Sequence, residues 1–103
     1  MLPLDLLSAD EAAREIASRV RTLRLHHGWT QVDTAARAGM TLASYKRFER
    51  TGEIAFKSLL RIAIAFGQLT QLDPWFHLPE FASLDEAMAR PKARVRAPRR
   101  RTT

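Results

Sequence analysis

The residues around Gly39 place the strongest constraint on how this chain can fold. A short segment rich in small residues begins after Thr30, a good helix N-cap, and ends at Gly39. Glycine adopts the left-handed conformation of a tight turn without steric strain, and Thr41 can cap a new helix at once. Because Ala35 has almost no side chain, two helices can cross closely there. The sequence therefore predicts two short helices joined by a compact corner.

Helical signals continue on both sides of this corner. A capping box of Ser8 and Glu11 predicts the start of a first helix, and Gly28 predicts its end. The helix that begins at Thr41 is expected to run to about Arg50. The apolar residues expected to face the core are Ile16, Val20, Leu23, Met40, Tyr45 and Phe48.

The chain beyond residue 50 predicts two further helices. Residues 51–53 form a loop, and a fourth helix covers residues 56–66 before Gly67 closes it. A fifth, short helix is expected within residues 69–78, although Pro74 leaves its limits open. The apolar residues of the fourth helix are Leu59, Leu60, Ile62, Ala63 and Phe66.

The C-terminal quarter differs from this body. A second capping box at Ser83 and Glu86 predicts a turn or two of helix to about Arg90. The last residues mix proline with like charges, which predicts a disordered tail. No internal repeat or strand-like alternation is present, so the fold class is all-α. The expected parts are 1–11, an N-terminal extension and helix cap; 12–78, a five-helix domain; 79–90, a short helical extension; and 91–103, a basic disordered tail.

Composition excludes several classes of protein. The chain has no cysteine, so a disulfide framework, a thiolate zinc site and a thiol nucleophile are ruled out. It has no apolar run of about 20 residues and no signal-peptide pattern, which favours a cytoplasmic bacterial or phage protein. His26, His27 and His77 lack partners at metal-site spacing, and no catalytic arrangement is readable. We therefore expect no enzyme activity, metal or cofactor.

Charge is distributed in blocks along the chain. The net charge is +6, and residues 12–66 hold ten basic and four acidic residues. Residues 67–89 carry a net charge of −4, whereas residues 90–103 carry +7 with no acidic residue. A basic block within a folded domain is expected of a surface that faces phosphates, and the alternative is an ordinary solvated face.

Residues 14–70, which include this corner, resemble the lambda-Cro-type (XRE) helix-turn-helix family. The residues that carry the resemblance are Thr30, Gln31, Ala35, Ala38, Gly39, Arg47, Phe48, Glu49, Arg50, Leu59, Leu60, Arg61, Ile62, Ala63, Phe66 and Gly67. The resemblance implies a compact lambda-repressor-like domain that binds double-stranded DNA. Thr34 departs from the family, which usually has a buried leucine there, and Ala55 stands where a Ser or Thr caps the fourth helix. Both departures predict a slightly weakened domain of the same fold.

The resemblance also implies which residues contact DNA, because the second helix of the motif lies in the major groove. The side chains expected to face base edges are Thr41, Leu42, Ala43, Lys46 and Arg47. Arg47 can donate to guanine O6 and N7, whereas Leu42 and Ala43 can contact thymine methyl groups. The alternative is that Lys46 and Arg47 touch only phosphate or solvent. Phosphate contacts are expected from Gln31, Ser44, Arg50 and Lys57.

Three further positions have a predicted role. Glu49 is expected to be structural, holding Arg37 or a backbone amide, and Trp29 is expected to pack in the core. Trp75 and Phe76 follow a complete small core in a segment that contains proline. Aromatic side chains dominate binding energy at interfaces, so these two predict a dimer or partner interface, with core capping as the alternative.

Shorter strings resemble the antitoxins of Hip-type toxin–antitoxin operons: residues 48–54, residues 81–87 and the Arg- and Pro-rich end. This resemblance implies an autorepressing antitoxin that binds an inverted-repeat operator as a homodimer and neutralises a toxin, with a kinase-like toxin favoured. A Hig-type antitoxin, and a phage-type or controller-type repressor without a toxin, are the alternatives. The basic tail could serve as a DNA arm, as a segment that folds on toxin or RNA, or as an inert end.

Overall fold

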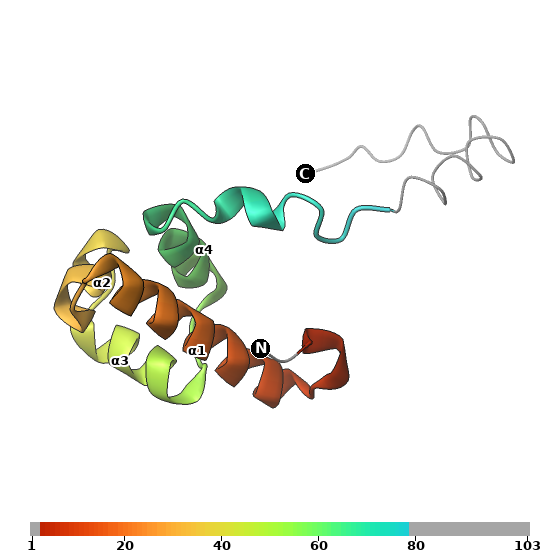
Figure 1. Ribbon diagram of the computed structural model, residues 1–103, viewed down its shortest axis with the longest axis horizontal. Helices are drawn as coiled ribbons and strands as arrows, with labels where there is room; N and C mark the ends of the chain where they lie inside the picture. The colour runs from red at the N-terminus through yellow and green to blue at the C-terminus, as the bar shows by residue number, and fades with distance from the viewer. Residues whose placement is uncertain (1–2, 79–103) are drawn as a thin grey trace, which may run out of the picture. The chain divides into compact units, whose positions relative to one another are not determined.

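The computed structural model describes residues 3–78, and this part of the chain is helical with no strand. Figure 1 shows the long first helix lying alongside the third, with the second and fourth at one end of the pair. Contacts divide the chain into one unit that ends at Asp73 and another that begins at Pro74. The elements are η1 (Leu4–Leu6), α1 (Ala9–His27), α2 (Gln31–Arg37), α3 (Leu42–Thr51), α4 (Phe56–Ala65) and η2 (Leu69–Leu72).

The predicted starts of α1, α2 and α3 are confirmed, and each is set by a local side-chain hydrogen bond. The Ser8 side chain accepts from the backbone N–H of Glu11, and the Glu11 carboxylate accepts from the backbone N–H of Ser8. The same reciprocal pair joins Thr30 to Asp33 at the start of α2, a pairing of the capping-box kind. Thr41 accepts from the backbone N–H three residues on and caps α3.

The predicted fifth helix is wrong. Residues Leu69–Leu72 form a single 3₁₀ turn, so residues 3–78 contain four α-helices. Pro74 has no backbone N–H with which to extend the turn, and the residue before the turn, Gln68, makes no side-chain capping bond. The short helix predicted after residue 78 and the basic tail lie outside the described residues.

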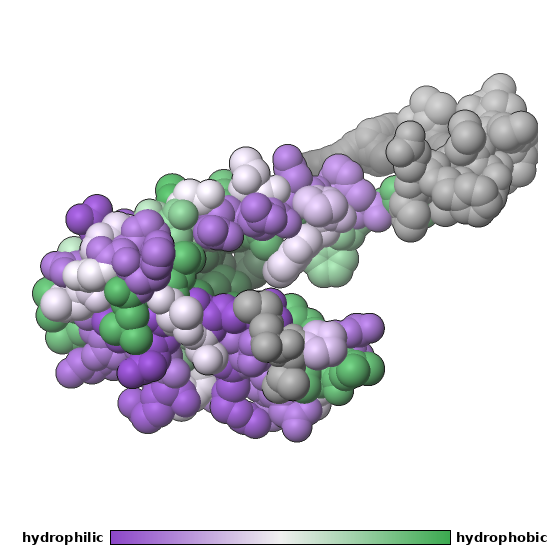
Figure 2. All heavy atoms as spheres, in the orientation of Figure 1, coloured by the Kyte–Doolittle hydropathy of each residue, from purple (hydrophilic) through white to green (hydrophobic). Residues whose placement is uncertain are grey.

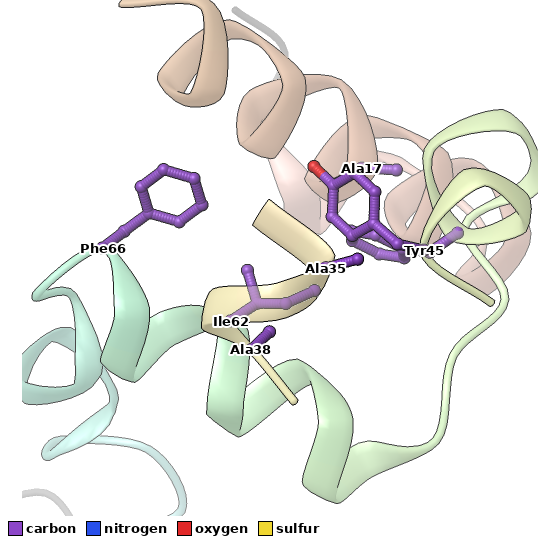
Figure 3. Packing of buried hydrophobic residues seen from close by; sticks show 7 residues of the cluster. Ala17, Ala35, Ala38, Tyr45, Ile62 and Phe66 are labelled. Atoms are coloured by element: carbon purple, nitrogen blue, oxygen red, sulfur yellow. The ribbon is translucent and has the colours of Figure 1, made fainter. Parts of the chain in front are cut away.

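The core lies where α1, α2, α3 and α4 meet. Tyr45 and Phe48 of α3 are fully buried, as the sequence predicted, and Met40 packs half-buried against them. The three buried alanines lie in α1, in α2 and at the C-cap of α2, and they leave room for close helix approach because each has only a methyl side chain. Figure 3 shows Ala35 of α2 lying beside Ile62 of α4. The buried apolar residues are Ala17, Ala35, Ala38, Tyr45, Phe48, Ile62 and Phe66.

The two departures from the family pattern have different consequences. Thr34 is completely buried, and its hydroxyl donates to the backbone carbonyl of Thr30 at 3.0 Å. The polar atom is therefore satisfied, as a buried hydroxyl must be. Ala55 has no side chain that can accept from the first turn of α4, so this helix lacks the side-chain cap that α1, α2 and α3 have.

Gly52 makes the close approach of α3 to α1 possible. Its φ of 83° is left-handed, and it is the C-cap of α3, where its backbone N–H donates to the carbonyl of Phe48. A Cβ at this position would lie 2.7 Å from the backbone carbonyl carbon of Ala13 in α1. Residue 52 must therefore be glycine for two independent reasons.

The surface of this unit is largely polar in the view of Figure 2, where hydrophilic side chains cover most of α1, α2 and α3. Exposed apolar side chains include Leu6, which precedes α1, and Phe56 and Ile64 of α4. None of the helices within residues 3–78 combines the length and the hydropathy needed to cross a lipid bilayer.

Candidate nucleic-acid interface

The corner between α2 and α3 is built as the sequence predicted. Gly39 has a φ of 67°, and the backbone N–H of Met40 donates to the carbonyl of Ala35 at 2.9 Å. This bond closes α2, and the cap at Thr41 opens α3 one residue later. Ala35 is 3% exposed, and α2 and α3 pack against each other. The corner fixes the direction of α3 against the rest of the domain.

Helix α3 has one buried and one exposed side. Tyr45 and Phe48 face the core, and the side chain of Glu49 is only 5% exposed. The remaining charged residues of this helix are all basic and exposed. They are Lys46, Arg47 and Arg50. The exposed side of α3 therefore presents cations without an exposed carboxylate of its own.

The structure places the predicted base-contacting residues together on this helix and its cap. Thr41, Ala43, Lys46 and Arg47 are exposed, whereas Leu42 is half-buried. The hydroxyl oxygen of Thr41 accepts from the backbone N–H of Ser44, so its own hydrogen remains a donor. Four of these five residues are therefore exposed at the surface.

The predicted phosphate-contacting residues are more dispersed. Ser44, Arg50 and Lys57 are exposed, on α3 and the first turn of α4. Gln31 is half-buried, and its side-chain amide donates to Glu49 at 3.0 Å. One amide hydrogen is thereby occupied, whereas the second hydrogen and the oxygen keep their capacity for another partner.

Glu49 is the centre of a buried polar cluster, which we call the Glu49 cluster: Arg24, Gln31, Tyr45 and Glu49. Arg24 donates from Nε to Glu49 at 2.7 Å and from Nη2 at 3.3 Å, and the Tyr45 hydroxyl donates to the same carboxylate. Arg24 also donates to the backbone carbonyl of Trp29 at 2.9 Å. The cluster thus ties α1, the start of α2 and α3 to one carboxylate.

The electrostatics of the cluster favour its charged form. Burial by itself raises the pKa of Glu49, but hydrogen bonds from Arg24, Tyr45 and Gln31 outweigh it and hold that pKa below its usual 4.5. Burial, together with the bond to Glu49, raises the pKa of the Tyr45 hydroxyl above its ordinary value. Tyr45 therefore remains a donor and Glu49 an acceptor at neutral pH.

The structural role predicted for Glu49 is confirmed, but the predicted partner Arg37 is wrong. The guanidinium of Arg37 lies 4.1 Å from the centroid of the Trp29 ring, in a cation–π arrangement. Trp29 stacks on Phe66 with ring centroids 4.8 Å apart, so its predicted packing against the core is also confirmed. Arg37 is exposed on the last turn of α2, whereas Arg24 is buried on α1.

Sequence reasoning missed the pairing of Arg47 with Glu53. The two side chains form an ion pair across the end of α3, and 62% and 64% of their surfaces are exposed. A spacing of six residues is not a regular helical contact, and the pair forms only because the chain turns at Gly52. No sequence signal known to us marks such a pair.

Trp75 and Phe76 belong to the unit that begins at Pro74. Trp75 is 47% exposed and Phe76 is 99% exposed, and their rings meet edge to face with centroids 6.4 Å apart. Phe76 has a φ of 61°, which is uncommon for a residue with a large side chain.

Residues 3–78 contain no group of three His, Asp or Glu side chains arranged to hold a metal ion. Comparison with curated proteins and with solved structures finds no match. A family model described as helix-turn-helix, of the XRE type, matches residues 20–70. The matched residues begin within α1 and continue through the corner and α4 to η2. Residues 20–70 are therefore similar to a helix-turn-helix domain of this type, which supports a DNA-binding transcriptional regulator.

Proposed function

We propose that the protein is a sequence-specific transcriptional regulator that inserts α3 into the major groove of an operator. The observation that carries this proposal is the exposed side of α3, which presents Lys46, Arg47 and Arg50 while its one carboxylate is buried in the Glu49 cluster. A rigid helix with a cationic face and a tight preceding corner is the arrangement that helix-turn-helix domains use to reach base edges.

The side chains proposed to contact base edges are Thr41, Leu42, Ala43, Lys46 and Arg47. Arg47 is the proposed source of base preference, because a guanidinium can donate two hydrogen bonds to guanine O6 and N7. Leu42 and Ala43 would contact thymine methyl groups, and the free hydroxyl hydrogen of Thr41 can reach a base or a phosphate.

Phosphate contacts are assigned to Gln31, Ser44, Arg50 and Lys57. The uncapped start of α4 supports the assignment of Lys57, since the side chain of Ala55 has no atom to which the first-turn amides could donate. Free amides and a positive dipole end at a helix start favour a bound anion. Gln31 would reach a phosphate with the amide hydrogen that Glu49 does not use.

The operator is proposed to be an inverted repeat bound by a homodimer. The half-site centres would lie about 34 Å apart, one helical turn of DNA. Trp75 and Phe76 are the proposed dimer or partner interface, supported by the exposure of both rings. Such a regulator would act in the cytoplasm or nucleoid, where the DNA is.

The finer proposal is an autorepressing antitoxin of a type II toxin–antitoxin operon, with a kinase-like toxin as its partner. Its support is the string of residues 48–54, the string of residues 81–87 and the basic end. The alternative is a stand-alone phage-type or controller-type repressor with no toxin partner. Co-purification with the product of the adjacent gene would separate the two, and a regulator with no such partner would favour the alternative.

The DNA-binding proposal is tested by selecting binding sites from random double-stranded DNA with the full chain. We expect an inverted repeat bound by two copies, measured by analytical ultracentrifugation of the complex. Arg47→Ala should lose preference at one base pair per half-site, worth about 1–3 kcal/mol. Arg21→Ala, which removes an exposed arginine from α1, is the matched control and should keep the preference. Binding without any sequence preference would contradict the proposal.

A further inference from the structure

The exposed pair of Arg47 and Glu53 is held by more than its charges. The Thr51 hydroxyl donates to the backbone carbonyl of Arg47 at 2.8 Å, and the backbone N–H of Glu53 donates to the Thr51 hydroxyl at 3.1 Å. Thr51 therefore fixes the backbone of Glu53 to the last turn of α3. Gly52 is buried against α1, where an added Cβ would lie 2.7 Å from the backbone carbonyl carbon of Ala13.

The two hydrogen bonds of Thr51 place the Glu53 carboxylate beside Arg47, the proposed base-contacting arginine. A cavity of about 180 Å³ separates the exposed side of α3 from the start of α4. The residues that line it are Met40, Ser44, Arg47, Glu53, Ile54 and Ala55. The lining includes side chains proposed above to contact base and phosphate, so Glu53 stands within the proposed DNA-contacting surface.

The chemistry of the pair leaves Arg47 able to contact a base. Glu53 accepts from Nη2 of Arg47, and a guanidinium has five N–H donors in one plane. The second hydrogen on Nη2, both hydrogens on Nη1 and the hydrogen on Nε are not taken by this contact. Release from Glu53 is therefore not needed before Arg47 donates to a guanine.

We propose that Glu53 is a specificity-determining positioning residue that stays paired with Arg47 in the DNA complex and fixes the guanidinium for a guanine. This inference rests on the proposed function. Glu53 acts in two ways. It restricts a long side chain to one orientation, and its negative charge weakens the attraction of Arg47 to any nearby phosphate. Arg47 then contributes to base preference more than to general affinity for DNA.

The test is a site selection from random double-stranded DNA with the full-length wild type, Glu53→Gln, Arg47→Ala and the double variant. We expect Glu53→Gln to lose roughly three- to tenfold of the preference at the base pair that Arg47→Ala affects, a part of what a bidentate pair supplies. Its affinity for non-specific DNA should stay equal or rise. The double variant should match Arg47→Ala, because Glu53 acts only through Arg47.

A matched control comes from the ion pair of Glu15 and Arg19 on α1, whose atoms lie 3.0 Å apart. Glu15→Gln also removes one carboxylate from an arginine, and it should leave the base preference unchanged. In the free protein, nitrogen-15 NMR of the Arg47 Nε–H should report a more mobile side chain in Glu53→Gln than in the wild type.

Three outcomes overturn the inference. An unchanged base preference in Glu53→Gln would do so while the proposed function stands. If Glu53→Gln raised the affinity equally for every sequence, and did so in the Arg47→Ala background as well, Glu53 would act only by repelling DNA phosphates. A wild type that selects no operator would refute the proposed function and with it the role of Glu53, a result distinct from the first two.

Discussion

Two glutamates four residues apart each hold an arginine, yet they belong to different kinds of region. Glu49 lies in the buried Glu49 cluster, where its carboxylate takes hydrogen bonds from α1, α2 and α3. Glu53 lies at what we call the α3–α4 edge, defined as Arg47, Glu53 and Ala55, where the ion pair is exposed. The comparison indicates that burial, and not the type of ion pair, decides whether such a contact stabilises the fold or only orients a side chain at the surface.

The largest expected difference follows from removing each carboxylate. Glu49→Ala leaves Arg24 buried without its charge partner, which should destabilise the domain by about 3–5 kcal/mol. Glu53→Ala should change stability by about 0–1 kcal/mol, because water already solvates both groups of that pair. Denaturation of both full-length variants in urea measures the two losses. Equal losses would break the comparison.

Gly52 connects the two regions, and its replacement should have the second largest effect. Gly52→Ala combines a left-handed φ with a clash against the backbone of Ala13, and we expect a loss of about 2–4 kcal/mol. Gly67→Ala is the matched control, since Gly67 has a φ of 69° but open space around it. That control should lose only about 1 kcal/mol, the backbone part of the effect. If the two variants lost similar amounts of stability, α1 would have shifted to make room for the new methyl group at little cost in free energy.

Acid should weaken the Glu49 cluster in a defined direction. The pKa of Glu49 is lowered in the folded domain, so the stability it contributes is complete above its unfolded pKa and is lost as pH falls through the lower folded value. Wild type should therefore exceed Glu49→Gln in stability at neutral pH, and the two should converge in acid. Glu11 and Asp33 also have lowered pKa values from their capping bonds, but both proteins keep them. A gap that persists unchanged to low pH would contradict this assignment.

Sequence reasoning succeeded where the controlling contact is local. Capping residues act on amides three positions away, so Ser8, Thr30 and Thr41 could be identified as helix starts without a structure. It failed where the contact depends on tertiary arrangement. Arg24 is 25 residues from Glu49, and only the packing of α1 on α3 brings it closer to the carboxylate than Arg37.

The same distinction explains the other errors and omissions. Pro74 was visible in the sequence as a break, yet the apolar residues around it were consistent with either a helix or the short turn that forms. The partnership of Arg47 and Glu53 depends on the turn at Gly52, so neither residue alone predicts it. The base-contacting residues remain predictions, since their exposure on α3 is necessary for DNA binding but does not identify a base.

The smallest expected effect concerns the start of α4, the one α-helix within residues 3–78 whose N-cap residue offers no side-chain acceptor. Ala55→Ser should stabilise the domain by about 1 kcal/mol, because a hydroxyl can accept from the first-turn amides. Ala55→Asp should stabilise it similarly but weaken DNA binding at every sequence, since a fixed carboxylate would occupy the amides proposed to face a phosphate.

The two variants together separate folding from binding at the α3–α4 edge. Thermal or urea denaturation gives the gain in stability, and titration of the selected operator and of an unrelated duplex gives the affinities. If Ala55→Asp binds DNA as tightly as the wild type, the start of α4 does not face a phosphate, and its missing cap is only a local weakness of the fold. If Ala55→Asp loses affinity equally on both duplexes while Ala55→Ser does not, the missing cap belongs to the DNA-binding surface. In that case the domain would be about 1 kcal/mol less stable than with a capped α4, and its first-turn amides would stay open to a phosphate. In the Glu49 cluster, by contrast, the donors of Arg24, Gln31 and Tyr45 are bonded to a carboxylate of the domain itself.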